Sequence, residues 1–400
     1  MHALVVTLGT AGDVLPMIGL GRALAARGHR VTVALNERFA GEARAAGLDF
    51  QSIGSVDEWR EVFENPTWYD PKRGYTVFTR GAILPAYQRV LAAIEAVRAP
   101  EDLVLVAAIQ AFGALGANRR LGIPLAVAYL QPATLRWVLP YQELRAAGAA
   151  SGLAIHLRTA LRFIGYRFLG DEAALLTDDR ALHLGLFPEW FAVPAATWPP
   201  TVRFSGFPLY DGGDSAELPD EARRFMSEGE PPVLITPGSN VHWAGPFCRA
   251  ALAACARLGR RAVVLTRYAD QLPPLDPETA RHFPFLPLGP ALACAAVMIH
   301  HAGISTVGRC LAAGVPQLVS PISYDHPFNG MTLEALGTGI AVPRERFTED
   351  AATAALDRLL HDPGSRRQAS RYAAEMAAHN RLDAACEAIE ALHRGRGRDR

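Results

Sequence analysis

The residues most able to do chemistry in this chain follow one short apolar stretch, residues 295–299. That stretch predicts a strand, after which His301 and Gly303 stand in a small-residue turn and a helix opens at Ser305 and Thr306. A helix N-terminus presents N–H groups and the positive end of a dipole, so it suits a phosphate. Gly303 would let a phosphate approach the backbone, the two hydroxyls add donors, and His301 adds a further donor or a positive charge. Taken singly, Ser305 has a second interpretation as the helix N-cap.

A second polar turn follows the next expected strand, residues 317–320, and ends in Asp325 and His326. Ligands of open α/β sheets bind outside the carboxyl ends of the strands. Both side chains are therefore candidates to hold hydroxyl groups, as a sugar would require, although Asp325 alone could be a turn residue. The order and spacing of the two turns favour a functional site.

A third turn, near the start of the chain, carries Asp13. The apolar run at 3–8 predicts a buried parallel strand, Gly9 and Gly12 follow it, and residues 14–27 have helical spacing. The carboxylate is a candidate general base, which must lie within hydrogen-bond reach of the hydroxyl that it deprotonates. Its alternative role is to cap the helix. A helix N-terminus lowers the pKa of a carboxylate, whereas burial raises it.

The same glycine turn could belong to a dinucleotide site. Such a site needs Gly-x-Gly-x-x-Gly and an acidic residue after the second strand. Glu37 is suitably placed, but two residues separate Gly9 from Gly12 and the middle glycine is absent. The spacing therefore disfavours a hydride-transfer enzyme.

Other candidates also follow predicted strands. Gly238 and Ser239 come after the strand at 233–236, where a Gly-Ser turn offers N–H groups to a phosphate or sugar. Arg267 comes after the strand at 262–266 and could pair with phosphates or remain a solvated charge.

Two residues are candidates for a pocket that binds a second substrate. Gln131 follows the expected strand at 124–130, and Trp68 lies in a loop region, where aromatic side chains often serve local packing instead. The stretch at 153–169 could be an amphipathic helix that touches lipid or a substrate tail, or a surface helix packed on the sheet.

Alternating strands and helices over 400 residues predict an α/β fold with two domains. We place the first domain at residues 1–211 and the second at 231–375. A linker region, 212–230, contains a Gly/Asp/Ser cluster, and a C-terminal helix with a basic tail occupies 376–400.

Charge balance, cysteine count and the length of the apolar runs disfavour several classes of protein. Lys+Arg and Asp+Glu number 40 each, so no net field favours nucleic acid or an anionic membrane. The five Cys are odd in number and lack Cys-x-x-Cys spacing, which favours a reducing compartment without disulfides or a zinc site. The first apolar run is too short for a signal peptide, and no run reaches the roughly 18 apolar residues of a spanning helix. We therefore expect a cytoplasmic protein.

The block at 300–326 resembles the donor-site signature of nucleotide-sugar glycosyltransferases of the two-Rossmann-domain type (GT-B, family 1). That signature is His-His-Gly-Gly-x-Gly/Ser-Thr, then Ala-Gly-Val-Pro-Gln, then Asp-Gln. Here Ala302 replaces the first Gly and His326 replaces the last Gln. The stretch at 9–16 resembles the opening of the same family, in which the residue after the second Gly, here Asp13, faces the acceptor hydroxyl as general base.

The resemblance implies two Rossmann-like, doubly wound domains that face across a cleft and close on their substrates. The first would bind a hydrophobic acceptor, and the second a nucleotide sugar whose hexose is transferred with inversion. Gly12 would line the donor site, Phe285 would stack on the nucleobase, and the backbone at Leu286 would pair with the base edge. An apolar strand end is the alternative for Phe285. The turn at 300–326 lacks a carboxylate cluster for Mg²⁺, so no metal cofactor is expected, and the final helix should return to the first domain.

Some stretches are similar to rhamnolipid-type rhamnosyltransferases, which move L-rhamnose from a dTDP donor to a hydroxy-fatty-acid ester. They are 65–72, 186–192, 206–212 and the Ala-Gly-Ile at 302–304. His326 keeps glucose and other hexoses open, and the base stays open between uracil and thymine. A nucleotide-sugar 2-epimerase of the same fold, or a non-catalytic auxiliary protein that binds nucleotide sugar, also stays open. The expected partners are a nucleotide sugar and a small apolar acceptor, without nucleic acid.

Overall fold

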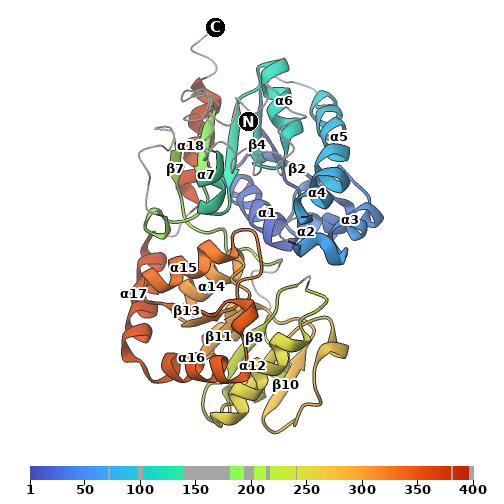
Figure 1. The fold of residues 1–400 in the computed structure, drawn as a ribbon. Helices are drawn as coiled ribbons and strands as arrows, with labels where there is room; N and C mark the ends of the chain where they lie inside the picture. The colour runs from blue at the N-terminus through green and yellow to red at the C-terminus, as the bar shows by residue number, and fades with distance from the viewer. Residues whose placement is uncertain are drawn as a thin grey trace, which may run out of the picture. The chain divides into compact units, whose positions relative to one another are not determined.

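The computed structural model describes residues 1–70, 73–97, 102–138, 181–192, 202–212, 217–239, 241–379 and 382–395. The chain divides into two compact units, Met1–Gly212 with Arg381–Arg400 and Gly213–Asn380. Each unit has its own parallel sheet (Figure 1). The amphipathic stretch expected at 153–169 and the Gly/Asp/Ser cluster of the linker lie outside the described residues.

The first unit contains a seven-stranded sheet in the order β3-β2-β1-β4-β5-β6-β7, with every neighbouring pair parallel. Its central strands are buried throughout, which explains their continuous apolar sequences. The strands are β1 (His2–Val6), β2 (Arg30–Leu35), β3 (Asp49–Ser52), β4 (Leu103–Ala108), β5 (Leu125–Tyr129), β6 (Leu182–Gly185) and β7 (Val202–Phe204).

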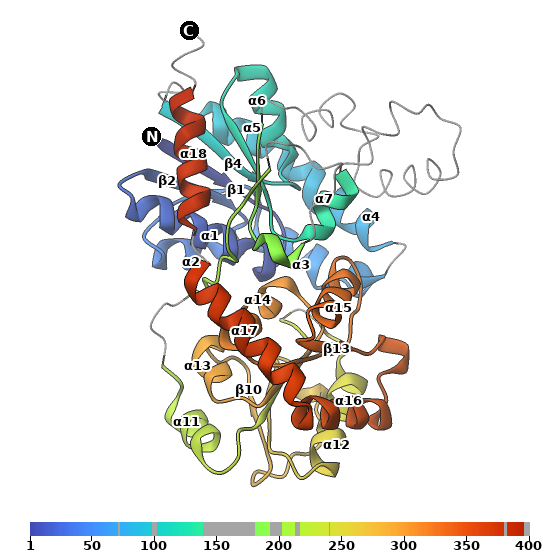
Figure 2. The same cartoon turned by 90° about the vertical axis from the view of Figure 1, so that its left-hand side faces the viewer.

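Helices cover both faces of this sheet (Figures 1 and 2). One face carries α1 and α18, and the other carries α5 and α6. The described helices of the unit are α1 (Ala11–Ala26), α2 (Ala40–Ala45), α3 (Val56–Phe63), α4 (Gly74–Phe78), α5 (Leu84–Glu95), α6 (Phe112–Leu121), α7 (Pro132–Val138) and α18 (Asp383–Gly395).

The last helix, α18, is held to the first unit by charged side chains as well as by packing. Glu390 accepts hydrogen bonds from Arg27 at 2.7 Å and pairs with His29 at 3.0 Å, both at the C-terminal end of α1 and the turn after it. His393, three residues after Glu390 in α18, lies 3.2 Å from Asp102. The C-terminal residues thus complete the first unit.

The second unit contains a six-stranded parallel sheet in the order β10-β9-β8-β11-β12-β13. Its strands are β8 (Val233–Thr236), β9 (Ala262–Leu265), β10 (Ala280–Phe283), β11 (Val297–His300), β12 (Gln317–Val319) and β13 (Gly339–Ala341). Its described helices are α11 (Asp220–Ser227), α12 (Gly245–Arg257), α13 (Leu288–Ala293), α14 (Ile304–Ala313), α15 (His326–Ala335), α16 (Glu349–His361) and α17 (Pro363–His379). Helix α11 falls within the residues expected to form a linker region.

Both sheets reverse their strand order beside their first strand, at β1/β4 and at β8/β11. Ligands of open α/β sheets bind outside the carboxyl ends of the strands at such a switch point. Gly238 and His301 lie in the turns after β8 and β11, and Asp13 lies in the first turn of the helix that follows β1. The topology therefore puts these predicted site residues at ligand-binding positions of their own sheets.

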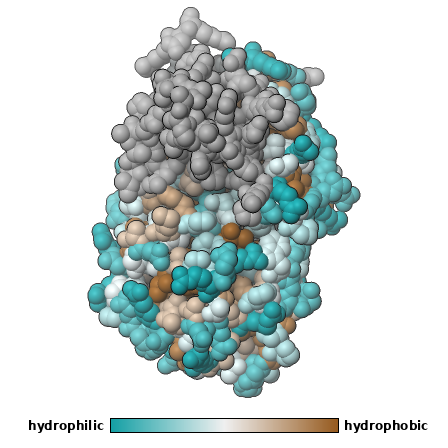
Figure 3. All heavy atoms as spheres, viewed as in Figure 1, coloured by the Kyte–Doolittle hydropathy of each residue, from teal (hydrophilic) through white to brown (hydrophobic). Residues whose placement is uncertain are grey.

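Neither the described helices nor the coloured face in Figure 3 has the extended apolar character of a membrane-spanning segment. Among the described residues, no helix is long and apolar enough to cross a membrane. On the coloured part of the face in Figure 3, apolar residues are interspersed with polar ones.

Candidate active site

Asp13 lies in the first turn of α1 and bonds back to the residue before the helix. Thr10 is the N-cap, and Asp13 Oδ2 accepts hydrogen bonds from its N–H at 2.9 Å and from its hydroxyl at 3.2 Å. This is a capping-box arrangement, so Asp13 occupies the third helical position and not the N-cap. The helix also begins three residues earlier than the expected Val14. No residue that the structure describes donates to Oδ1, the second carboxylate oxygen.

Burial dominates the electrostatics of this carboxylate. Removal from water raises the pKa of Asp13 from 3.8 to about 6, against the smaller opposing effect of the two Thr10 hydrogen bonds. Of the two opposing effects expected from the sequence, desolvation is therefore the larger. A carboxylate with a pKa near 6 is mostly ionised at neutral pH and binds a proton better than an ordinary aspartate.

The turn before Asp13 is fitted closely around the carboxylate. A Cβ at Gly9 would lie 2.3 Å from Asp13 Oδ2, and Gly9 has a φ of +136°, so the position requires glycine. The carbonyl of Gly9 accepts a hydrogen bond from the indole N–H of Trp59, in α3, at 3.0 Å. The indole thus fixes the turn that supports the carboxylate.

A pocket within the first unit opens beside this turn. It lies between the turn after β1, α3 and the start of α5, is partly open to solvent, and has a cavity volume of about 30 Å³. Leu8, Val14, Ile53, Phe63 and Pro85 contribute to its mostly apolar lining. Gly9, in the turn before Asp13, and Val14, the residue after it, both line the pocket, whereas Asp13 itself is not part of the lining.

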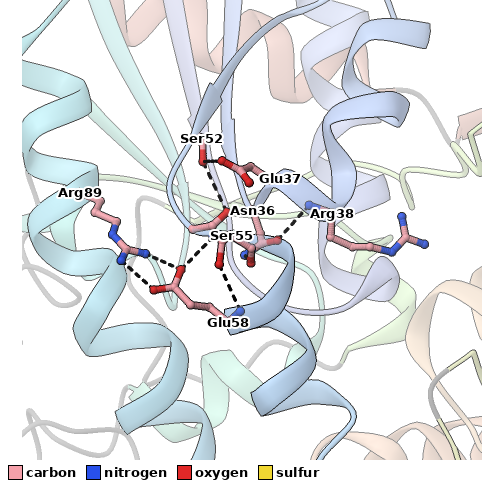
Figure 4. Close-up of polar contacts among 8 residues, drawn as sticks. Asn36, Glu37, Arg38, Ser52, Ser55, Glu58 and Arg89 are labelled. Carbon is pink, nitrogen blue, oxygen red and sulfur yellow. Dashed lines mark hydrogen bonds and ion pairs between the residues drawn. The ribbon is translucent and has the colours of Figure 1, made fainter.

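Asn36, Glu58 and Arg89 line this pocket. With Ser55 they form a hydrogen-bonded group, here called the pocket bracket (Figure 4). Glu58 of α3 and Arg89 of α5 form two hydrogen bonds of 2.7 Å each. Glu58 also accepts from the N–H of Ser55 at 2.8 Å, and Asn36, after β2, donates to the carbonyl of Ser55 at 2.8 Å. Arg89 and then the Ser55 N–H lower the pKa of Glu58 to about 2, so the pair stays charged. The pocket bracket links α3 to α5 and to the turn after β2.

The two residues proposed from the sequence to bind an acceptor are not part of this pocket lining. Trp68 is only 8% exposed and packs against Phe63 and Phe78, with ring centroids 4.9 and 5.2 Å away. Its ring belongs to an aromatic core cluster, which leaves little surface for a ligand. Gln131 is half-buried at the end of β5, where its carbonyl accepts hydrogen bonds from Thr134.

In the second unit, the imidazole of His301 is seated between two glycines. A Cβ at Gly238 would lie 2.8 Å from the ring, and a Cβ at Gly303 would lie 2.5 Å from its Nε2. Gly238 also has a φ of +108°. The sequence predicts that Gly303 lets a phosphate approach the backbone. The structure adds a different requirement, because a side chain at either position would displace the imidazole.

Helix α14 begins immediately after this seat. Gly303 is its N-cap, and Ser305 and Thr306 occupy the second and third helical positions, both partly exposed. The interpretation of Ser305 as the N-cap is therefore wrong, since the extended φ and ψ of the cap belong to Gly303. The helix N-terminus and the two hydroxyls are nevertheless placed as a phosphate would require.

The histidines of this site are held neutral. Burial, followed by the nearby His326, lowers the pKa of His301 well below its usual value, and burial lowers the pKa of His326 to about 3. Their rings meet edge to face with centroids 4.8 Å apart, and neither buried Nδ1 has a partner among the described residues. Of the two roles expected for His301, hydrogen bonding to a phosphate fits this state better than a positive charge.

Asp325 and His326 lie at the start of α15, and both are buried. His326 Nε2 lies 4.0 Å from Asp325 Oδ1. The distance suits an ion pair, but the lowered pKa keeps His326 uncharged at neutral pH, so the contact is not one. Asp325 Oδ2 instead accepts a hydrogen bond of 2.6 Å from Asn329, one turn along the helix.

The remaining candidates of this unit lie at the ends of other strands. Ser239 and Arg267, after β8 and β9, are exposed, and Arg267 forms no ion pair with a described residue. Phe285, after β10, is 65% exposed, so its ring is open to a ligand. Leu286 points its side chain into the core of the unit, which leaves only its backbone for a ligand.

Comparisons with known proteins show which proteins the two parts of the chain are similar to. The glycosyltransferase family 28 N-terminal domain matches residues 3–140, and the Erythromycin biosynthesis protein CIII-like C-terminal domain matches residues 249–392. An O-mycaminosyltylonolide 6-deoxyallosyltransferase of Streptomyces fradiae is 29% identical over 421 aligned positions, which cover 98% of this chain and 97% of the relative. The chain is a glycosyltransferase.

Solved structures share the fold of this glycosyltransferase. The glycotransferase of kitacinnamycin is 24% identical with a TM-score of 0.72, over 98% of each chain. A spinosyn rhamnosyltransferase in complex with thymidine diphosphate is 20% identical with a TM-score of 0.71. The match covers 98% of this chain and 100% of that chain. The predicted fold class, two Rossmann-like α/β domains, is confirmed.

The sequence analysis of the glycosyltransferase missed several residues that support these sites. Trp59, Glu58 and Arg89 had no role, although the Ser-x-x-Glu spacing at 55–58 is a readable capping signal. Asn329 was also missed, although its position four residues after Asp325 places both on one helix face. Among the described residues, no group of three or more His, Cys, Asp or Glu is placed to hold a metal ion.

Proposed function

We propose that this glycosyltransferase moves a hexose, L-rhamnose or glucose, from a dTDP- or UDP-sugar to a hydroxyl of a hydrophobic small molecule. The first unit would bind the acceptor and the second unit the donor. The mostly apolar pocket beside Asp13 supports the first assignment. The helix N-terminus with Ser305, Thr306 and the seated His301 supports the second.

The observation that carries the proposal is the Asp13 carboxylate itself. Its Oδ2 is fixed by Thr10, its Oδ1 has no described partner, and its pKa lies near 6. In the proposed reaction Asp13 takes the proton of the acceptor hydroxyl while that oxygen attacks the anomeric carbon. The bond from that carbon to the diphosphate oxygen breaks, and the nucleoside diphosphate leaves with the electron pair. A single displacement of this kind inverts the anomeric configuration.

The leaving diphosphate would be stabilised by the N-terminus of α14, the Ser305 and Thr306 hydroxyls, an imidazole N–H of His301 and the turn at Gly238 and Ser239. Arg267 would add a positive charge. A Cβ at Gly12 would make only an ordinary contact, 3.7 Å from the Thr10 hydroxyl, so the backbone at Gly12 can be approached by a ligand.

The sugar and the base would be held by separate groups. Asp325 and His326 would accept and donate hydrogen bonds to the hexose hydroxyls, and Phe285 would stack on the nucleobase with the Leu286 backbone at its edge. These groups bind the donor without a metal ion.

The donor and acceptor classes are proposed from likeness. The thymidine diphosphate of the spinosyn rhamnosyltransferase favours a dTDP donor and a deoxyhexose such as rhamnose. The name of the Streptomyces fradiae relative favours an antibiotic-like acceptor, whereas the local similarities at 65–72 and 186–192 favour a hydroxy-fatty-acid ester. Both acceptors are largely apolar and carry a reactive hydroxyl.

The first test is thermal stabilisation by UDP, dTDP, UDP-glucose, dTDP-rhamnose and NAD at matched concentration. A ligand at about 100 times its dissociation constant should stabilise the protein by roughly 2.7 kcal/mol. A shift with one nucleotide and its sugar conjugate is expected and would identify the base. No shift with any nucleotide, from folded protein, would contradict the donor site, and donor turnover without acceptor would indicate a 2-epimerase.

A further inference from the structure

Asn329 joins the two turns of the donor site. It lies in α15 with 0% of its surface exposed, and its Nδ2 donates two hydrogen bonds. One goes to the carbonyl of Ala302, in the turn after β11, at 2.9 Å. The other goes to Asp325 Oδ2 at 2.6 Å. A single amide therefore connects the residue proposed to hold the sugar with the turn that leads to the phosphate site.

The chemistry of this position requires an amide. Both partners are acceptors, and the amide of Asn329 serves both because its one nitrogen carries two N–H donors without adding a charge. An aspartate there would place a second carboxylate beside that of Asp325, and a leucine would remove both hydrogen bonds. Asn329 Oδ1 is itself buried without a partner among the described residues, which costs free energy. Retention of such a group at a cost to stability is typical of functional sites.

The turn that Asn329 holds is conformationally strained. Ala302 is fully buried with a φ of +69°, a region that residues with a Cβ rarely adopt. Its N–H donates to His300 Nδ1 at 3.2 Å, and its carbonyl is fixed by Asn329. A strained turn keeps its conformation only when surrounding contacts determine it. Asn329 is one of these contacts, and it sets the direction of the chain into His301.

We propose that Asn329 is a positioning residue for the donor sugar, which acts by orienting the carboxylate of Asp325 relative to the turn at Ala302. The inference rests on the proposed function, because it assumes that Asp325 holds the sugar. The nucleoside diphosphate alone does not engage Asp325. Loss of Asn329 should therefore weaken binding of the sugar conjugate more than binding of the nucleoside diphosphate alone.

The experiment is a double-mutant cycle of Asn329→Ala and Asp325→Ala in the full chain. Dissociation constants are measured for the nucleoside diphosphate and its sugar conjugate, using the base identified by thermal shift. The readout is the dissociation constant of the nucleoside diphosphate divided by that of its sugar conjugate. This ratio isolates the contribution of the sugar to binding. Leu333→Ala, also buried on α15, is the control for simple destabilisation of the helix. Asn329→Ser replaces the alanine variant in the same cycle if the latter does not fold.

We expect Asn329→Ala to reduce the ratio about tenfold, as for a lost hydrogen bond to a charged group, and Leu333→Ala to leave it unchanged. In the Asp325→Ala background, removal of Asn329 should have no further effect on the ratio. Additive effects would overturn the inference while leaving the role of Asp325 intact. If Asp325→Ala leaves the ratio unchanged, the proposed sugar contact of Asp325 fails and the inference fails with it.

Discussion

Replacement of Asp13 by asparagine should separate catalysis from stability. The amide oxygen of Asn can still accept the two hydrogen bonds from Thr10, so the capping arrangement at the start of α1 is kept. The amide cannot take a proton from an acceptor hydroxyl. Loss of a general base typically costs between about 10² and 10⁴ in rate. We therefore expect turnover of Asp13→Asn to fall by at least about a hundredfold.

The same substitution should stabilise the fold at neutral pH. The carboxyl loses its proton near pH 3.8 when unfolded and near pH 6 when folded. Between these values the folded protein binds more protons than the unfolded chain, so the stability contributed by Asp13 falls as pH rises. At 1.36 kcal/mol per pKa unit, the cost of the charge above pH 6 has an upper bound of about 3 kcal/mol. Asparagine avoids this cost, because it carries no charge.

The assay pairs urea unfolding with turnover, each measured from pH 4 to pH 8 for both proteins. The difference in unfolding free energy should be near zero at the acid end, grow through pH 5, and level off above pH 6 in favour of Asp13→Asn. The wild-type kcat/KM for acceptor should decline below about pH 6 as the base becomes protonated. A variant with near-normal turnover would remove Asp13 from the mechanism. A variant less stable than the wild type at pH 8 would refute the argument from desolvation.

Three further predictions address the supports of the site. Gly9→Ala should destabilise the protein by roughly 2 kcal/mol more than Gly28→Ala, since both have positive φ but only a Cβ at Gly9 meets Asp13, and unfolding curves of the two variants test this. Glu58→Gln, which breaks the ion pair of the pocket bracket, should raise acceptor KM roughly two- to fivefold with donor KM unchanged. Asp57→Asn, in an exposed pair on the same helix, is its control, and equal effects on both substrates would exclude a role at the pocket. Turnover should survive dialysis against EDTA, and loss that Mg²⁺ restores would show that a metal takes part.

Much of the fold could be predicted because its signals are local. The apolar runs at 3–8 and 124–130 predicted β1 and β5 within two residues, because parallel strands buried on both faces must be apolar throughout. Helix starts were less accurate. The Thr-x-x-Asp spacing at 10–13 shows that α1 begins before Val14, but its capping signal was assigned to Asp13 alone.

The other features of the candidate site depend on contacts between residues far apart in the sequence, which the sequence alone does not predict. Gly238 makes room for the imidazole of His301 because the two residues follow neighbouring strands of one sheet. They are 63 positions apart in the sequence, so no local pattern reveals their contact. Trp68 was a candidate acceptor contact because it lies in a loop region, yet three aromatic side chains pack around it. The sign of the pKa shift of Asp13 also needed the structure, because the sequence shows the helix N-terminus but not the burial.

The return of α18 to the first unit has a consequence for protein engineering. A chimaera that exchanges all residues after Gly212 would import a foreign helix onto the first sheet and replace Glu390, the partner of Arg27 and His29. The second unit is topologically an insertion, with one junction at Gly212–Gly213 and the other at Asn380–Arg381. Recombination of donor specificities between relatives should therefore use two crossovers and leave the native C-terminal segment in place.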